Sequence, residues 1–423
     1  MHTSIVLRRM MLVLGLIGIL IITTAAIVPA GIGISPRSPN PGLFFVDYRH
    51  LDGGEDGVAL LDLNPESKHF GKLLQREAIG KGVLPHHLYF NHDESRLYTT
   101  ALGGSRLYEL ILDKGRDGVP HITKVVPIDT GGNLVGEDIY FTRDGSRFYM
   151  TFMGGQGGAN DGTVGVFDAR TNELIETIQS LPDDANPAKP FIKHAHGISA
   201  NEDLGILMVT STVHPDLVSE VGNTVTAIDM TTNEVRSTHL VADNPEDLSQ
   251  PVEVLLTRDD LPPFALVTTV NGGDIWVAPY DAETGSFGTF VKQVDGGDQG
   301  LGVALELYIH TNHHGEKELY VSFAVPGVIN VYGLDSLPEL PLKRTLRAGA
   351  GAHHMAFFET ETGRELIVVQ NNLLNAPGLN DGTLQVLDTH TGELVGTVDL
   401  VTEYRLMPES IESALGHGAD LHH

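Results

Sequence analysis

Apolar and polar residues alternate with a period of two over most of the chain after residue 40, which predicts β-strands rather than helices. Three segments show the pattern most clearly. Each has alternating apolar residues that end in Asp, then a turn with Thr and Asn or Gly, then a second short strand. They are GTVGVFDARTNELIETI from Gly162, GNTVTAIDMTTNEVRSTHL from Gly222 and DGTLQVLDTHTGELVGTVDL from Asp381.

Weaker copies of this segment begin near Gly57, Ser105, Asp274 and Gly327, which makes seven copies spaced by roughly fifty residues. Six copies follow a further pair of strands, such as LYFNHDESRLYTTAL from Leu88. A four-stranded unit that occurs seven times predicts an all-β fold, a seven-bladed β-propeller, because one blade cannot bury both of its faces alone. A β-sandwich array is the alternative, but it does not explain so regular a repeat.

The propeller is expected to span residues 41–402. Its first unit begins near residue 42 without an obvious innermost strand. The tail, residues 403–423, is a candidate to supply that strand and close the ring. Residues 1–40 precede the propeller and have a different composition.

The N-terminal segment predicts export. Arg8 and Arg9 precede an apolar run from Met10 to about Val28, and Pro29 follows. Residues 1–40 are therefore expected to be a signal peptide or a retained N-terminal membrane anchor, plus a linker. In either case the propeller is expected outside the cytoplasm, in the periplasm or at the cell surface, secreted or anchored to the membrane.

Charge and composition exclude several classes of function. The formal net charge of −28 argues against a nucleic-acid partner, because phosphate binding needs positive charge. The chain has no cysteine, which excludes disulfides, thiolate metal ligands and cysteine nucleophiles. No G-x-S-x-G motif is present, which argues against serine hydrolysis.

Aligning the repeats on the aromatic-x-x-Asp turn of their first hairpin reveals a column of polar residues just before each innermost strand. These strands line the channel of a propeller, so equivalent positions form a ring at one mouth. In the sixth repeat, where the hairpin is longer, Glu306 is the expected equivalent. The other members of the column are His87, Asp138, His196, Glu253 and His354.

Imidazoles and carboxylates that converge from several blades are what a divalent metal site needs. Three histidines without a thiolate suit copper, zinc, iron or manganese. His86, His194 and His353 lie one or two residues from the column, as alternative or supporting ligands. Strand alternation predicts that His86 and His353 face the other side of their strands. The alternative is a ring of polar residues that only line a wet channel.

Other histidines and loops carry weaker signals. His313 and His314 fall in an expected hairpin turn, and His422 and His423 end the chain in a tail that is expected to be disordered. Three connections, beginning near Gly154, His214 and Asn371, are longer than a hairpin needs. Rim loops of this kind are expected to restrict access to the channel.

The order of these details resembles the selenium-binding protein and methanethiol oxidase family, a seven-bladed group within the YVTN/YncE-type propellers. The matching segments are HGISANEDLGILMVTST before GNTVTAIDM, PVEVLLTRDDLPPFALV, LELYIHTNHHGEKELYVSF and HHMAFFETETGRELIVVQN before DGTLQVLD, within residues 85–400. The resemblance implies a copper-dependent oxidase of methanethiol. Its histidine ligands would correspond to His87, His196 and His354, with Glu253 as the acidic residue of PVEV. The family's cysteine-containing selenium site has no counterpart here, and the aromatic content is lower than usual.

The leading hypothesis is a metal-dependent, copper-favouring oxidoreductase that acts on a small molecule outside the cytoplasm. His87, His196 and His354 bind the metal in this hypothesis, and Glu253 or Asp138 is a further ligand or the general base. A second hypothesis is a non-enzymatic YncE-type propeller that holds a protein partner on its rim. A third is a lactonase-like hydrolase.

Overall fold

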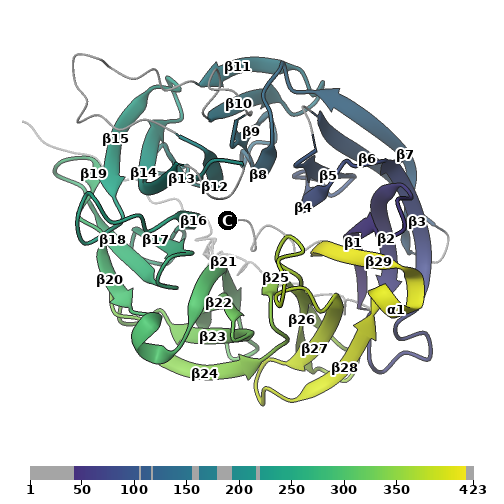
Figure 1. Ribbon diagram of the computed structural model, residues 1–423. Coiled ribbons are helices and arrows are strands. Elements are labelled where there is room, and N and C mark those ends of the chain that lie inside the picture. Colours follow the sequence, from purple (N-terminus) through teal and green to yellow (C-terminus); the bar gives the residue numbers. More distant parts are fainter. Residues whose placement is uncertain are drawn as a thin grey trace, which may run out of the picture. The chain divides into compact units, whose positions relative to one another are not determined.

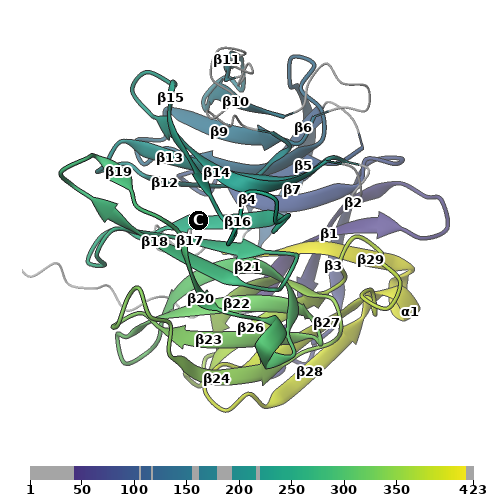
Figure 2. The same cartoon turned by 60° about the vertical axis from the view of Figure 1, so that its left-hand side comes forward.

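Seven antiparallel sheets of short strands make up the described part of the chain, as seen in a computed structural model that describes residues 42–103, 106–115, 118–154, 162–178, 193–215 and 220–415. Figure 1 shows the sheets following one another around a ring, and the turned view in Figure 2 shows them as separate layers packed on their neighbours. The prediction of an all-β, seven-bladed propeller is confirmed. The expected signal peptide or anchor in residues 1–40 and the terminal histidines lie outside the described residues.

The first four sheets have four strands each, named in order from the innermost strand outward. Their strands are β29 (Leu406–Ser413), β1 (Leu43–His50), β2 (Asp56–Asp62) and β3 (Leu73–Gly80); β4 (Pro85–Phe90), β5 (Arg96–Ala101), β6 (Arg106–Lys114) and β7 (Pro120–Asp129); β8 (Gly136–Phe141), β9 (Arg147–Phe152), β10 (Thr163–Asp168) and β11 (Leu174–Ile178); and β12 (Ala195–Asn201), β13 (Ile206–Val213), β14 (Val221–Asp229) and β15 (Val235–Leu240).

The last three sheets follow the same order, except that two short strands share the outer edge of the fifth sheet. Their strands are β16 (Pro251–Leu256), β17 (Phe264–Thr269), β18 (Ile275–Asp281), β19 (Ser286–Phe287) and β20 (Val291–Val294); β21 (Gly302–Thr311), β22 (Lys317–Val325), β23 (Val328–Gly333) and β24 (Leu342–Arg347); and β25 (Ala352–Glu359), β26 (Glu365–Asn371), β27 (Thr383–Asp388) and β28 (Leu394–Asp399).

Helix is almost absent from the described residues, which contain the short 3₁₀ turn η1 (Gly297–Gln299) and the helix α1 (Leu400–Tyr404). The side chain of Asp399 accepts a hydrogen bond from the backbone N–H of Thr402, which caps the start of α1. Arg405, in the left-handed region, ends it. No helix in the described ranges has the length and apolar composition that a membrane crossing requires.

The ring closes through β29, the innermost strand of the first sheet. β29 pairs with β1 in antiparallel register, with Phe45 opposite Glu412 and Val46 opposite Ile411. α1 turns the chain from the outermost strand of the seventh sheet back to this position. The first sheet therefore combines the two ends of the propeller.

The repeated Asp of each strongly conforming segment forms the turn after the third strand. Oδ1 of Asp168 accepts the backbone N–H groups of Arg170 and Thr171 at 3.0 and 2.8 Å. Asp229 and Asp388 make the same pair of contacts in their own sheets. This local side-chain bonding explains why Asp ends the strand and Thr follows.

The core lies between the sheets rather than within any one of them. Seven clusters of buried apolar residues each join one sheet to the next, and the cluster at the closure contains Phe44 from β1 and Phe358 from β25, whose rings meet edge to face at 5.3 Å. This arrangement follows from the pattern of the strands, because each sheet has two apolar faces that only its neighbours can cover.

Candidate metal centre

A β-bulge in which two residues face one interrupts the innermost strand of six sheets close to its start, and β29 has an extra residue of its own, Glu409, between its pairs with Asp47 and Tyr48. In the second sheet Pro85 pairs with Ala101 and Leu88 with Thr99, so that His86 and His87 together face the single residue Thr100. An extra residue of this kind breaks the alternation of side chains and re-aims them. We call the two residues of each bulge its bulge pair. The six bulge pairs are His86–His87, Glu137–Asp138, His196–Gly197, Val252–Glu253, Leu305–Glu306 and His353–His354.

A polar side chain on the neighbouring strand holds each bulge in place. The backbone N–H of His87 donates to Oγ1 of Thr100 at 3.1 Å, and that of Gly197 donates to Oγ1 of Thr210 at 2.8 Å. The other four bulges make the same bond, to Thr151, Thr268, Ser322 and Gln370. The bond satisfies an amide that the ladder leaves without a partner.

Several of these side chains also join one sheet to the next. The hydroxyl of Thr210 donates to the carbonyl oxygen of Val252 at 2.7 Å, and that of Thr268 donates to the carbonyl oxygen of Leu305 at 2.6 Å. In both cases the acceptor belongs to the first residue of the next bulge pair. Neighbouring bulges are thus fixed relative to each other around the channel.

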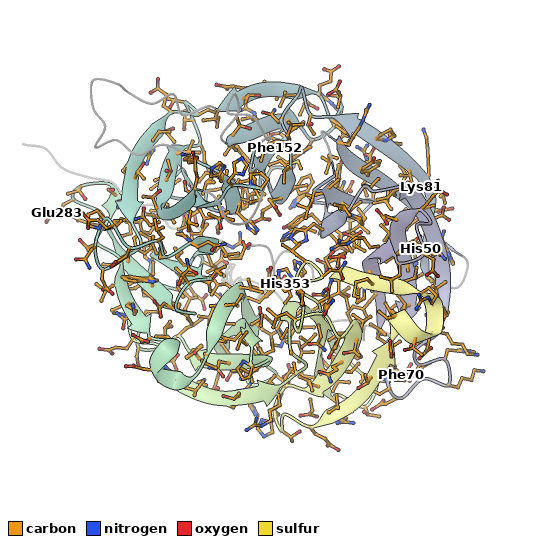
Figure 3. All side chains as sticks on the ribbon, in the orientation of Figure 1. His50, Phe70, Lys81, Phe152, Glu283 and His353 are labelled. Atoms are coloured by element: carbon orange, nitrogen blue, oxygen red, sulfur yellow. The ribbon has the colours of Figure 1, made fainter. Side chains whose placement is uncertain are left out.

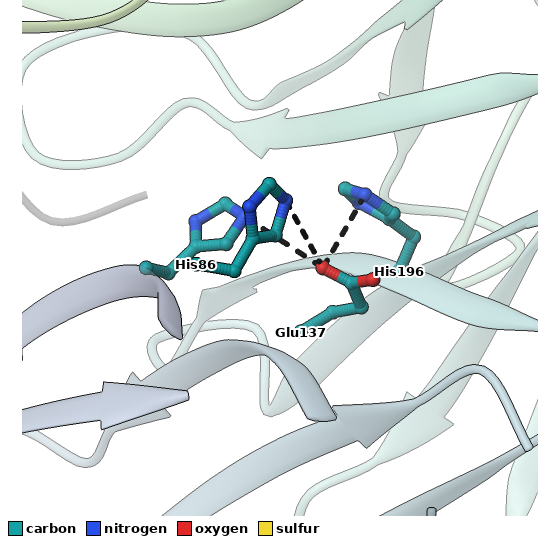
Figure 4. Close-up of side chains that lie close together, drawn as sticks. His86, Glu137 and His196 are labelled. Carbon is teal, nitrogen blue, oxygen red and sulfur yellow. Dashed lines mark ion pairs between the residues drawn. The ribbon is translucent and has the colours of Figure 1, made fainter. Parts of the chain in front are cut away.

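Four side chains from three bulges converge on one point. Oε2 of Glu137 lies 3.4 Å from Nε2 of His86, 3.8 Å from Nε2 of His87 and 3.6 Å from Nε2 of His196. Figure 4 shows the rings of His86 and His196 turned toward this carboxylate. One donor atom from each residue lies within 4.8 Å of every other. We call these four residues the first donor group.

A second donor group shares one residue with the first. It consists of His87, Glu306 and His354, with Oε1 of Glu306 3.4 Å from Nδ1 of His354. The same oxygen lies 3.4 Å from Nε2 of His353, whose ring stacks on that of His354 at 3.9 Å. Figure 3 shows His353 toward the centre of the ring, whereas Lys81 and Glu283 lie at its outer edge.

The geometry of the first donor group fits a metal ion. Ligands at about 2.0–2.1 Å around a tetrahedral ion lie about 3.3 Å apart, close to the separations from Glu137. Nε2 of His87 and Oε2 of Glu137 are buried and make no hydrogen bond to any described residue. Buried polar atoms without hydrogen bonds are costly, and coordination would remove that cost.

Burial controls the protonation of this group. It lowers the pKa of both His86 and His87 well below the usual value, and the neighbouring imidazoles add to the effect. Burial raises the pKa of Glu137 to about 8, although the nearby His196 opposes the rise. The imidazoles of His86 and His87 are therefore neutral at pH 7, as metal ligation requires, while Glu137 holds a proton that a metal would displace.

Tyr89, two residues after His87, fixes the orientation of that ring. The Tyr89 hydroxyl lies 2.9 Å from Nδ1 of His87 and donates a short hydrogen bond to Oδ1 of Asp138. Because the hydroxyl proton is directed at Asp138, the hydroxyl accepts from Nδ1–H of His87. This assigns the tautomer whose lone pair is on Nε2, the atom that faces Glu137.

Asp138 and Glu253 lie beside the donor groups, not within them. Besides Tyr89, Asp138 accepts the backbone N–H groups of Ile139 at 2.8 Å and Ile198 at 2.9 Å. Oε1 of Glu253 lies 3.0 Å from Nδ1 of His196. Burial, followed by the charges of Glu306 and Asp138, raises the pKa of Glu253 well above its usual range.

The remaining candidate histidines lie apart from both donor groups. His194 bonds through Nδ1 to the carbonyl oxygen of Met153 at 2.9 Å and faces Glu220 at 3.4 Å, so it belongs to neither donor group. His313 and His314 are exposed in the turn between β21 and β22, and His313 pairs with Glu365.

Two features of the site differ from the expectation of strict alternation. His86 and His87 both approach Glu137, because the bulge turns consecutive side chains toward the same space. His196 is the first residue of its bulge pair, whereas His87 and His354 are second. Sequence analysis did not identify Glu137. The available signal was that paired polar residues recur at the same place in three repeats, at 86–87, 137–138 and 353–354.

A cavity of about 570 Å³ opens above the first donor group, within the usual size of small-molecule sites. Its floor includes His86, Glu137, His196 and His353. Most other lining residues are apolar, among them Leu84, Leu102, Val135, Met153, Val303 and Leu305. Pro215 and residues 373–377 also line it, from two of the connections expected to limit access, and residues 216–219 of the first connection lie outside the described residues.

Gly197 provides the space for Glu253. A Cβ at Gly197 would lie 2.5 Å from the carbonyl oxygen of Val252 and 2.6 Å from Oε2 of Glu253. We expect Gly197→Ala to lower the free energy of unfolding by about 1–3 kcal/mol, as crowding in a packed interior does. Urea unfolding checks this. Gly297→Ala is the matched control, since its new Cβ would have only an ordinary contact. Equal stability of the two variants would contradict the assignment.

No protein-family model matches the sequence, and no curated protein is significantly similar to it. Solved structures with the same architecture include a hypothetical selenium-binding protein from Sulfolobus tokodaii, 15% identical, with a TM-score of 0.66 over 91% of this chain and 96% of that one.

Two further similar structures are a periplasmic gluconolactonase from Pseudomonas aeruginosa and a putative 6-phosphogluconolactonase from Bacteroides uniformis. They are 14% and 16% identical, with TM-scores of 0.58 and 0.56, and each comparison covers 88% of this chain and 98% of the other. Similarity at these identities shows the fold. The resemblance to selenium-binding proteins thus extends to architecture, without a family match in sequence.

Proposed function

We propose that this protein is a metal-dependent oxidoreductase, with copper the favoured metal, that acts on a small molecule at one mouth of the channel. The observation that carries the proposal is the first donor group beside a mainly apolar cavity, which three of its four residues, His86, Glu137 and His196, help to line. The floor supplies the ligands and the cavity supplies the space for a substrate.

The donor set favours copper over the alternatives. His86, His87 and His196 provide imidazoles, Glu137 provides a carboxylate, and the chain has no thiolate to offer. Imidazole sites bind Cu²⁺ more tightly than Zn²⁺ or Fe²⁺ when geometry does not intervene. Copper would supply one-electron chemistry, which no side chain at the site provides.

The surrounding residues have separate roles in this proposal. Tyr89 orients the ring of His87 through its Nδ1 atom, and Glu253 lies within ion-pair distance of Nδ1 of His196. Glu253 is the better candidate to exchange a proton with a substrate, since its raised pKa means that its carboxyl group holds a proton that it can donate. Asp138 is already held as an acceptor by Tyr89 and two backbone amides.

A lactonase is the second candidate, because two of the similar solved structures are described as lactonases. The cavity walls argue against a sugar lactone. Hydroxyl groups buried against residues such as Leu84, Val135 and Leu305 would lack hydrogen-bond partners. A non-enzymatic propeller that holds a protein on its rim would need no converging donor group.

We also propose that the protein acts outside the cytoplasm. The proposal rests on the charged and apolar segment from Arg8 to Val28, whose composition is that of an export signal or an anchor.

Elemental analysis of protein purified without chelators tests the proposed function. We expect about one metal ion per chain and, for the copper form, an electron paramagnetic resonance spectrum with nitrogen hyperfine structure. Oxygen consumption with small apolar reductants, thiols included, measures the activity. Protein that neither contains nor binds a metal, or that hydrolyses lactones without one, would refute the proposal.

A further inference from the structure

The wall of the cavity contains one strongly cationic side chain. Arg49, at the end of β1, is the single arginine or lysine among the described residues that line it. It lies close enough to His86 for its charge to contribute to lowering the pKa of that imidazole. The cation therefore faces the same space as the first donor group.

Arg49 is held in place from behind. Its Nε donates a short hydrogen bond to Oε1 of Glu409, which is 2% exposed. Oε2 of Glu409 accepts from Nδ2 of Asn372 at 3.1 Å, which fixes the carboxylate in turn. This support sets the position of the guanidinium group before any ligand enters.

The outer edge of the Arg49 guanidinium group, formed by Nη1 and Nη2, remains available to bind a ligand. No described residue accepts a hydrogen bond from Nη1 or Nη2 of Arg49, whereas Arg344 and Arg405 use their Nη groups on carboxylates. A guanidinium group carries five N–H donors on more than one edge, so it can bind Glu409 and a second anion together. Its planar donors match a carboxylate best.

The rest of the cavity wall favours a ligand whose remaining part is apolar. Leu84, Val135 and Val303 each lie two residues before a bulge pair and have a positive φ, of 52°, 57° and 57°. Such a backbone is rare and unfavourable for branched side chains. The three apolar side chains are nevertheless found at equivalent positions around the same opening. A ligand that covers them with apolar surface gains binding free energy from the apolar area that is removed from water.

We propose that the cavity binds a small monocarboxylate with an apolar body, and that Arg49 recognises its carboxylate. The proposal deepens the proposed function, because it names the class of molecule placed above the donor groups. The carboxylate is held on the Arg49 side of the cavity and the apolar part fills the space lined by Leu84, Val135 and Val303. Recognition by Arg49 does not require the metal.

Titration calorimetry with hexanoate and its neutral isostere hexanamide tests this recognition. We expect the wild-type protein to bind hexanoate about tenfold or more tightly than hexanamide, because only the acid carries the charge that pairs with a guanidinium group. The preference should be lost in the double variant Arg49→Met/Glu409→Gln, which removes the pair without leaving a buried charge. Arg49→Lys should keep part of the preference and shows whether the site still folds.

The same binding measurements on protein stripped of metal distinguish this proposal from the proposed function. Hexanoate should keep its preference there, since Arg49 and not the metal holds it. A preference seen only with metal bound would place the carboxylate on the metal and overturn the proposal. Equal binding of acid and amide, binding of neither up to about 10 mM, or an unchanged preference in the double variant would also overturn it. Metal content, measured on the same samples, reports on the proposed function independently.

Discussion

Replacing His87 with alanine is expected to reduce the affinity for the metal by at least about 100-fold. Changes to residues that only support a ligand cost 10- to 100-fold, and His87 belongs to both donor groups. The bulge should survive the change, because Thr100 holds the backbone amide of residue 87 and not its side chain. Competition with a chelator of known affinity measures the loss.

Two further variants make this result interpretable. His314→Ala removes an exposed imidazole in a turn and should leave the affinity unchanged. Tyr89→Phe keeps the ligand but removes the hydroxyl next to its Nδ1, so a loss of about tenfold is expected. If His87→Ala and His314→Ala bound the metal equally well, the donor groups would be only polar residues that line a wet channel.

The affinity for the metal is expected to rise about tenfold for each pH unit up to about pH 8 and then to level off. Burial raises the pKa of Glu137 to about 8, so below that value a proton must leave before its carboxylate can bind the metal. The pKa values of His86 and His87 are lowered well below their usual value, so these rings stay neutral and contribute no further slope above about pH 6.5. Calorimetry in buffers of different ionisation enthalpy counts the released proton.

Glu137→Gln is the matched variant for this prediction. The amide keeps the size of the side chain and one oxygen donor but has no proton to release. We expect weaker binding that is nearly independent of pH between about 6.5 and 8. A wild-type affinity that does not change over this range would mean that Glu137 is not a ligand.

Much of the fold follows from short-range chemistry that the sequence displays directly. The Asp of segments such as TVGVFD bonds to the two amides that follow it, so the end of each third strand is readable from Asp168, Asp229 and Asp388. Alternating apolar residues then predict sheets with two apolar faces, and seven such sheets cover one another in a ring.

The site was harder to predict, because it depends on one extra residue in each innermost strand. Alternation correctly relates Phe90 to Leu88, but it fails at His86 and His87, where the bulge places both rings near Glu137. The residues that hold the bulge, such as Thr100 and Thr210, lie on the neighbouring strand and look like ordinary strand threonines in the sequence. Distances between atoms of different sheets follow only from the closed ring.

The pairing of β29 with β1 is expected to make the donor groups a late product of folding. The donor residues lie between His86 and His354, on separate sheets, and we expect those sheets to adopt their final spacing only when the last strand pairs with the first. Contacts so distant in sequence form slowly, since a long loop must close before they can. A metal that binds only the closed ring would stabilise all seven sheets together by mass action, not just the strands that touch it. The protein's resistance to unfolding would then depend on how much metal its compartment supplies.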